Sequence, residues 1–145
     1  MPDTYYYDIS GNNSTMLLVR LQQTINNKQG IHFWAIGIGT NDGNAAQYEQ
    51  NLKAIIQMLL DNGKQPIIAR IPFRCDNEYN NNIVKSCNVV VDRLTEQYKL
   101  PAGPDLYTYF EQNPLHLRDR LHPTDTDGIR AIQRLWAEVA CNLKD

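Results

Sequence analysis

Serine and cysteine are scarce in this 145-residue chain, and it has no long apolar run. Without an apolar stretch of about 20 residues, no segment is expected to span a bilayer as a helix. Lysine and arginine form no block and the formal net charge is −2, so electrostatics give no support for nucleic acid or an anionic membrane as a partner. The opening MPDTYYYDIS lacks the basic and apolar regions of a signal peptide. Cytosolic and secreted locations both stay open.

The three cysteines are Cys75, Cys87 and Cys141, and they form no CxxC pair or cluster with histidine. Nothing in that pattern indicates a structural zinc site. Cys75 and Cys87 flank the polar stretch DNEYNNN, where a disulfide could staple a loop in an oxidising compartment. The alternative, which the spacing favours, is two unrelated thiols, one in a loop and one on a helix.

The chain does contain a regular alternation of strand and helix patterns. Apolar and β-prone runs predict strands at 5–9, 31–38, 66–73 and 104–110. Helical spacing of apolar residues predicts helices at 14–27, 48–59, 83–98 and 129–143, the last capped by the Thr/Asp cluster at 124–127. The order predicts one α/β domain over 1–145, a three-layer α/β/α sandwich around a parallel sheet.

Three polar motifs follow predicted strands or precede the last helix. They are Ser10-Gly11-Asn12, GTND at 39–42 and DRLHP at 119–123. Ligands of open α/β sheets bind at the carboxyl ends of the strands. We therefore expect the three motifs to converge on one edge of the sheet.

Asp119 and His122 have the chemistry of a base with its orienting partner. An imidazole that acts as a general base needs a group that fixes its tautomer and stabilises its protonated form. A carboxylate three residues earlier in a tight turn can reach the same ring. From these residues alone, the favoured alternative is that Asp119 caps the turn while His122 is an ordinary surface residue.

Asn41, Gly39 and Gly11 also have two interpretations. The Asn41 amide could donate a hydrogen bond to a developing oxyanion, and Gly39 would allow close approach of a substrate. Gly11 could add a backbone N–H to the same site. Alternatively, the GTNDG sequence forms a turn that caps the helix at 44, and Gly11 ends a strand.

Taken together, these segments resemble the SGNH/GDSL hydrolase superfamily. YYYDISGNNST resembles the family's second block, with Gly11 as the glycine of that block. GTND is similar to the third block, G-x-N-D, and DRLHP is similar to the fifth block, D-x-x-H-P. The resemblance implies a flavodoxin-like sheet and a serine esterase without a metal or cofactor. It implies that His122 is the base, Asp119 its orienting acid, and Asn41 and Gly11 parts of the oxyanion hole. The implied substrates are short-chain esters, and acetyl groups on carbohydrate are one candidate. Tyr107 and Tyr109 could stack on a sugar, but packing in the core or on the surface explains these two residues equally well.

The G-D-S block that carries the family's nucleophile is absent. The three serines are Ser10, Ser14 and Ser86, and none lies in a G-D-S context. Because nucleophilic catalysis depends strictly on placement, none is identified as the nucleophile, and Ser14 and Ser86 are expected to be structural. The domain is thus predicted to be N-terminally incomplete, with the nucleophile segment outside this chain.

In the family's sheet the missing strand would lie between the strands at 5–9 and 31–38. Their facing backbone groups would then be unpaired, at a cost of several kcal/mol. Four explanations stay open: a truncated product, a strand from another chain, a permuted domain in a larger protein, or a remodelled sheet in a non-hydrolytic protein. The last corresponds to the main alternative function, a binding or scaffold protein. A flavodoxin-like or receiver-type module would need a phosphate loop or acidic cluster that the sequence does not show.

Overall fold

Three parallel strands form one sheet in the order β1-β2-β3. The computed structural model describes residues 4–6 and 12–143. The strands are β1 (Thr4–Tyr6), β2 (Phe33–Ile36) and β3 (Gln65–Ile68). β2 and β3 are shorter than the runs at 31–38 and 66–73 that predicted them, because residues 37–38 and 69–73 continue beyond the paired strands as loop, with a single bridge at Arg70.

The gap that a missing strand was expected to leave between the strands at 5–9 and 31–38 is not found at residues 4–6. β1 pairs directly with β2, with Thr4 opposite Phe33 and Tyr6 opposite Ala35. The expectation that these strands lack a shared neighbour is therefore wrong for residues 4–6. Direct pairing satisfies the backbone N–H and C=O groups that an empty place would have left unpaired. The rest of the predicted strand, 7–9, lies outside the described residues.

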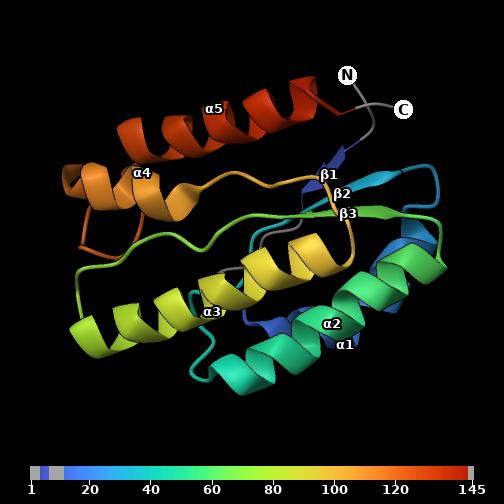
Figure 1. Cartoon of the computed structure of the whole chain (residues 1–145). Coiled ribbons are helices and arrows are strands. Elements are labelled where there is room, and N and C mark those ends of the chain that lie inside the picture. The colour runs from blue at the N-terminus through green and yellow to red at the C-terminus, as the bar shows by residue number, and fades with distance from the viewer. Residues whose placement is uncertain (1–3, 7–11, 144–145) are drawn as a thin grey trace.

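Helices cover both faces of the sheet (Figure 1). One face carries α1 (Ser14–Asn27), α2 (Ala45–Asp61) and α3 (Glu78–Gln97). The other face carries α4 (Leu106–Gln112) and α5 (Asp127–Cys141), with the short η1 (Pro114–His116) between them in the chain. The α/β class and the layered parallel architecture are confirmed. Among the described helices, none combines the length and the apolarity that crossing a membrane requires.

The core has two parts, one on each side of the sheet. Leu21, Leu52 and Ile56 belong to the part beneath α1–α3, and Trp136 of α5 packs with Phe33 and Ile67 on the opposite face. All four residues of β2 are buried. That burial explains why the strand reads as a continuous apolar run, as strands covered on both faces do.

The strand expected at 104–110 is wrong, because this segment is mainly helical. Only a single β-bridge joins Asp105 to Arg70. The Asp105 carboxylate then accepts hydrogen bonds from the Thr108 backbone N–H (3.1 Å) and hydroxyl (2.7 Å). This N-cap starts α4 despite the β-prone aromatic residues that follow.

The cysteines are all free thiols. Cys87 is buried on α3, while Cys75 lies in the loop before that helix and is partly buried. The structure therefore contains the two unrelated thiols rather than a loop-stapling disulfide.

Candidate active site

The DRLHP motif forms a closed turn at the rim of the sheet. Its base is a β-bridge between Leu117 and Pro123, and the Arg118 N–H donates to the His122 carbonyl at 2.8 Å. Gly128 at the start of α5 lets the helix approach this turn, because a Cβ there would come within 2.5 Å of the His116 carbonyl oxygen. The Thr124 hydroxyl accepts the Gly128 N–H at 2.8 Å. Of the 124–127 cluster expected to cap α5, Thr124 supplies this hydrogen bond, whereas the N-cap residue Thr126 makes no side-chain cap bond.

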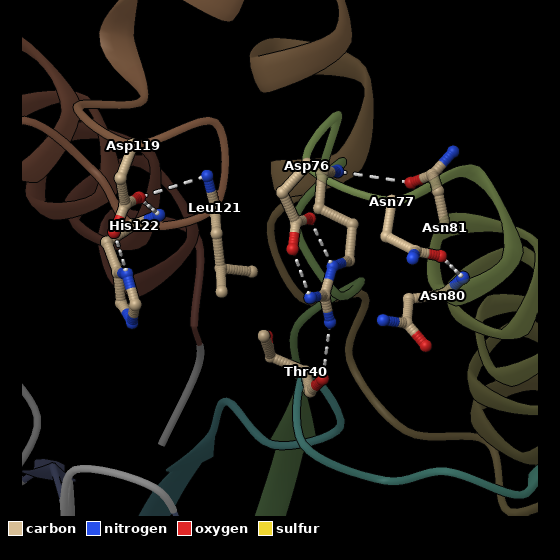
Figure 2. Close-up of polar contacts among 9 residues, drawn as sticks. Thr40, Asp76, Asn77, Asn80, Asn81, Asp119, Leu121 and His122 are labelled. Carbon is tan, nitrogen blue, oxygen red and sulfur yellow. Dashed lines mark hydrogen bonds and ion pairs between the residues drawn. The ribbon is translucent and has the colours of Figure 1, made fainter.

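Within this turn, Asp119 holds His122 through both carboxylate oxygens (Figure 2). Oδ2 lies 2.6 Å from the imidazole Nδ1, and Oδ1 accepts the backbone N–H groups of His122 (2.6 Å) and Leu121 (3.1 Å). These hydrogen bonds, the backbone one from His122 foremost, hold the pKa of Asp119 well below its ordinary value. Because an ionised carboxylate only accepts, the neutral ring in this contact carries its proton on Nδ1 and keeps the lone pair on Nε2.

Both side chains of this pair are about half exposed. The Nε2 atom can therefore be reached by a hydroxyl group without any rearrangement of the core. This is the geometry that a general base with an orienting acid requires. The turn thus contains both expected arrangements, because Asp119 caps its own turn and also holds the His122 ring.

The loop after β2 carries Asn41 and is fixed by close packing at Gly39. The φ angle of Gly39 is +138°, and a Cβ there would lie 2.3 Å from the Ile71 Cδ1 atom. The buried Tyr48 donates its hydroxyl to the Ile38 carbonyl at 2.9 Å, and Asp42 N–H donates to the Gly39 carbonyl at 3.1 Å. Gly39 is therefore required by the packing of the loop, whatever its role toward a substrate.

Asp42 ties the same loop to the start of α1. Its carboxylate accepts hydrogen bonds from the Ser14 backbone N–H (3.1 Å) and the Ser14 hydroxyl (2.5 Å). The fully buried Ser14 hydroxyl also accepts an N–H from Asn51 at 2.9 Å. Ser14 is thus a structural residue, as predicted. No role was predicted for Asp42 from the sequence, although it directly follows Asn41.

The Asn41 side chain is oriented by the segment that precedes α1. Its Nδ2 donates to the Asn12 carbonyl oxygen at 3.1 Å. An amide nitrogen has two hydrogens, so one N–H remains for another acceptor. Gly11, the second expected oxyanion-hole residue, and Ser10 lie outside the described residues. Of the first motif, only Asn12 lies within the described residues, and this contact joins it to the loop that carries Asn41.

The loop after β3 joins the two halves of the site. The Arg74 guanidinium donates to the Thr40 carbonyl at 3.2 Å, and the Cys75 N–H donates to the Arg120 carbonyl at 2.9 Å. Figure 2 shows Asp119 and His122 on one side of the view and Thr40 and Asp76 on the other. The GTND loop and the DRLHP turn are therefore both bonded to one segment, Arg74–Cys75, which was given no role from the sequence.

Two buried asparagines of α3 hold that segment. The Asn88 side chain accepts the Ile71 N–H (2.7 Å) and donates to the Ile71 carbonyl (3.0 Å). The Asn81 side chain accepts the Arg74 N–H (3.1 Å) and donates to the Tyr107 hydroxyl (3.1 Å). A signal was present in the sequence, because asparagine is unusual on the buried face of a helix.

Tyr107 and Tyr109, suggested as platforms for a sugar, are used in packing. Tyr107 is buried and its ring meets Phe73 edge-on with centroids 5.7 Å apart. The Tyr109 hydroxyl lies 2.7 Å from Nδ1 of His116, and its ring meets Phe110 edge-on at 5.1 Å. These contacts account for both side chains without a ligand.

An open cavity of about 680 Å³ lies between the carboxyl half of the sheet and α5. Its lining is mainly apolar and includes Gly37, Thr40, Ile71, Leu106 and Trp136. It reaches the Asn41 loop through Thr40, whereas Asp119 and His122 are not part of its wall. Among the described residues, no group of three or more His, Cys, Asp or Glu side chains could hold a metal ion.

No protein-family model matches the chain, and no curated protein does. Solved structures do match it. The acetylxylan esterase Axe2 from Geobacillus stearothermophilus aligns with 94% of this chain and 70% of its own, at 19% identity and a TM-score of 0.76. LAE5, an α/β hydrolase from the metagenome of Lake Arreo in Spain, aligns with 93% of this chain and 71% of its own, at 18% identity and a TM-score of 0.74. The chain therefore has the fold of these hydrolases.

Proposed function

We propose that this chain is the base-bearing part of a serine ester hydrolase that cleaves short-chain acyl esters, acetyl esters above all. The observation that carries the proposal is the Asp119–His122 pair, in which the carboxylate holds Nδ1 at 2.6 Å and leaves Nε2 accessible. A carboxylate in that position orients the ring and stabilises the imidazolium that forms during catalysis. The arrangement serves proton transfer and is not needed merely to close the turn.

The proposed reaction has two steps, acylation of the serine and hydrolysis of the acyl-serine. His122 Nε2 takes the proton of a serine hydroxyl as its oxygen bonds to the ester carbonyl carbon, and the oxyanion accepts a hydrogen bond from Asn41. The ester C–O bond then breaks, and the proton on Nε2 passes to the leaving alcohol. Water attacks the acyl-serine in the same way, which releases the acid and restores the serine.

The nucleophilic serine is proposed to come from a G-D-S segment outside this chain. The Ser14 hydroxyl is buried and bonded to Asp42 and Asn51, and the Ser86 hydroxyl bonds to the Asn82 carbonyl within α3. Ser10 lies two residues before Asn12, whose carbonyl binds Asn41, and is the candidate that the experiment must exclude. Because β1 pairs with β2 directly, this segment is not proposed to fill a place between them, and a separate second chain is not part of the proposal.

Axe2 offers a parallel to the proposed chemistry of Asp119 and His122. Catalytic mutants of Axe2 replace a serine, an aspartate and a histidine, and its aspartate and histidine are separated by the same interval as Asp119 and His122. Axe2 acts on acetylxylan or acetyl-xylooligosaccharides. For this chain we propose an acetylated carbohydrate as the substrate class.

The competing proposal is a binding or scaffold protein that keeps the pocket without the chemistry. The absence of a suitably placed serine among the described residues favours it. The retained Asp119–His122 geometry argues against it, because a non-catalytic pocket has no need of a half-exposed ring held at Nδ1.

A serine-directed fluorophosphonate separates these proposals. The native chain and a fusion that adds a strand–helix segment with a G-D-S block ahead of residue 1 would be labelled and mapped by mass spectrometry, with circular dichroism as the control for folding. We expect label on the added serine only, and its loss in the His122→Ala fusion. A folded fusion without label would support the binding protein. Label on Ser10 of the native chain would place the nucleophile within this chain and overturn its proposed source.

A further inference from the structure

Arg74 is the most fully engaged charged side chain at the rim. Its Nε and Nη2 atoms donate to the two Asp76 carboxylate oxygens, each at 2.7 Å, and Nη1 donates to the Thr40 carbonyl at 3.2 Å. The side chain is only 11% exposed, against 49% for Arg93 in its ion pair with Glu49. The fork of hydrogen bonds to Asp76 raises the pKa of Arg74 and lowers that of Asp76, so the pair stays charged at neutral pH.

The acceptor of Nη1 belongs to the peptide that joins Thr40 to Asn41. A charged donor on a carbonyl polarises the whole peptide group, which strengthens the N–H at its other end as a donor. That N–H belongs to Asn41 and has no acceptor within the described part of the chain. Arg74 thus acts, through the Thr40–Asn41 peptide, on the residue expected to stabilise the oxyanion.

The residue next to Arg74 contacts the other half of the site. The Cys75 N–H donates to the Arg120 carbonyl, inside the turn that carries Asp119 and His122. Asn81 holds the backbone N–H of Arg74 at 3.1 Å and so fixes the segment to α3. One short segment therefore holds both the Asn41 loop and the His122 turn.

We propose that Arg74, with Asp76 as its fixed counter-ion, is a positioning residue that sets the Asn41 loop and the His122 turn at their working separation. The inference rests on the proposed esterase function for its meaning. The contacts themselves belong to the folded chain and can be tested without any turnover.

The test is amide hydrogen exchange by NMR on the native chain, comparing wild type with Arg74→Ala. Two amides report on the site, Cys75 (to the Arg120 carbonyl) and Asp42 (to the Gly39 carbonyl), while Lys64 (to the Leu59 carbonyl) is a distant reference. We expect Cys75 and Asp42 to exchange faster by roughly tenfold or more, the effect of losing a charge-assisted hydrogen bond. Lys64 should keep its rate.

Arg93→Ala is the matched control, because it removes another arginine–carboxylate pair without touching the rim, and it should leave both reporter amides unchanged. Millimolar guanidinium chloride should restore slow exchange in Arg74→Ala, and sodium chloride of equal ionic strength should not. The His122 Nδ1–H resonance should broaden in the variant and sharpen on rescue.

Unchanged exchange at Cys75 and Asp42, or faster exchange at all three amides together, would overturn the proposal. If Arg74→Ala does not fold, Arg74→Lys and Asp76→Asn carry the same test with a smaller expected change. If the exchange results are as expected but the fusion has no esterase activity, only the proposed function is contradicted. If the exchange results are not as expected but the fusion is fully active, only the positioning role of Arg74 is contradicted.

Discussion

The backbone N–H of Cys75 donates a hydrogen bond of 2.9 Å to the carbonyl oxygen of Arg120. This bond joins the loop after β3 to the turn that holds His122. Together with the Arg74–Thr40 contact, it brings the carboxyl ends of the strands and the DRLHP turn to one rim. The candidate site is therefore assembled by backbone groups as much as by its own side chains.

Gly39→Ala should destabilise the protein by roughly 2–4 kcal/mol, because the new Cβ adds overpacking to an unfavourable backbone conformation. The closest atom to that Cβ would be Ile71 Cδ1 at 2.3 Å. Urea denaturation measures the change. Gly43→Ala in the same loop is the matched control, since a Cβ there meets nothing within 4 Å. Equal stability for the two variants would contradict this account of the loop.

Arg120→Gly should make the protein more stable by about 1 kcal/mol, since glycine adopts the left-handed conformation without the penalty that a side chain incurs. The φ angle of Arg120 is +66°. Lys99, with a φ of +53° after α3, provides a parallel substitution that should shift thermal melting in the same direction. A less stable Arg120→Gly protein would mean that the arginine side chain makes a contact that outweighs its strain.

Sequence patterns located most of the helices, because their apolar stripes repeat with the helical period and asparagine caps begin several of them. The expected helix at 14–27 coincides with α1, and Asn44 caps α2 through the Gln47 N–H. The Asp119–His122 contact was also foreseeable, since a tight turn brings residues three apart into reach.

Other features had no local signal. The Arg74–Thr40 bond spans 34 positions, and nothing in the spacing of either residue announces it. At 104–110 the aromatic residues favour a strand, but Asp105 caps a helix, and the segment forms α4 instead. The direct β1–β2 pairing was missed because the family's strand order was assumed, whereas the backbone groups of β2 pair with whichever strand lies beside it.

Cys141 should react readily with iodoacetamide at pH 8, whereas Cys87 should react only after unfolding. Burial, with a smaller contribution from the negative charge of Asp42, raises the pKa of Cys87 to about 11, and its thiolate is then rare. Cys141 is exposed. Mass spectrometry after timed alkylation checks the order of reaction. A non-reduced protein with a Cys75–Cys87 bridge would contradict the free thiols.

The Asp119 carboxyl should titrate well below the ordinary aspartate value of about 3.9. Its pKa is lowered in the folded protein, so its contribution to stability is complete above the unfolded value and is lost as pH falls through the folded one. Carboxyl ¹³C NMR between pH 1 and 6 follows the titration of Asp119. An ordinary midpoint would mean that the His122 and Leu121 amides do not hold the carboxylate in solution.

The most direct measurement is the rate of p-nitrophenyl acetate hydrolysis by the G-D-S fusion and its Asp119→Asn, His122→Ala and Asn41→Ala variants. We predict that each substitution lowers kcat by roughly a hundredfold or more, with KM little changed, because each removes an interaction made in the transition state. Combining the Asp119 and His122 changes should cost little more than the His122 change alone, since the two act as one unit. A folded, active fusion whose rate survives the loss of His122 or Asn41 would contradict the claim that these residues serve one catalytic point.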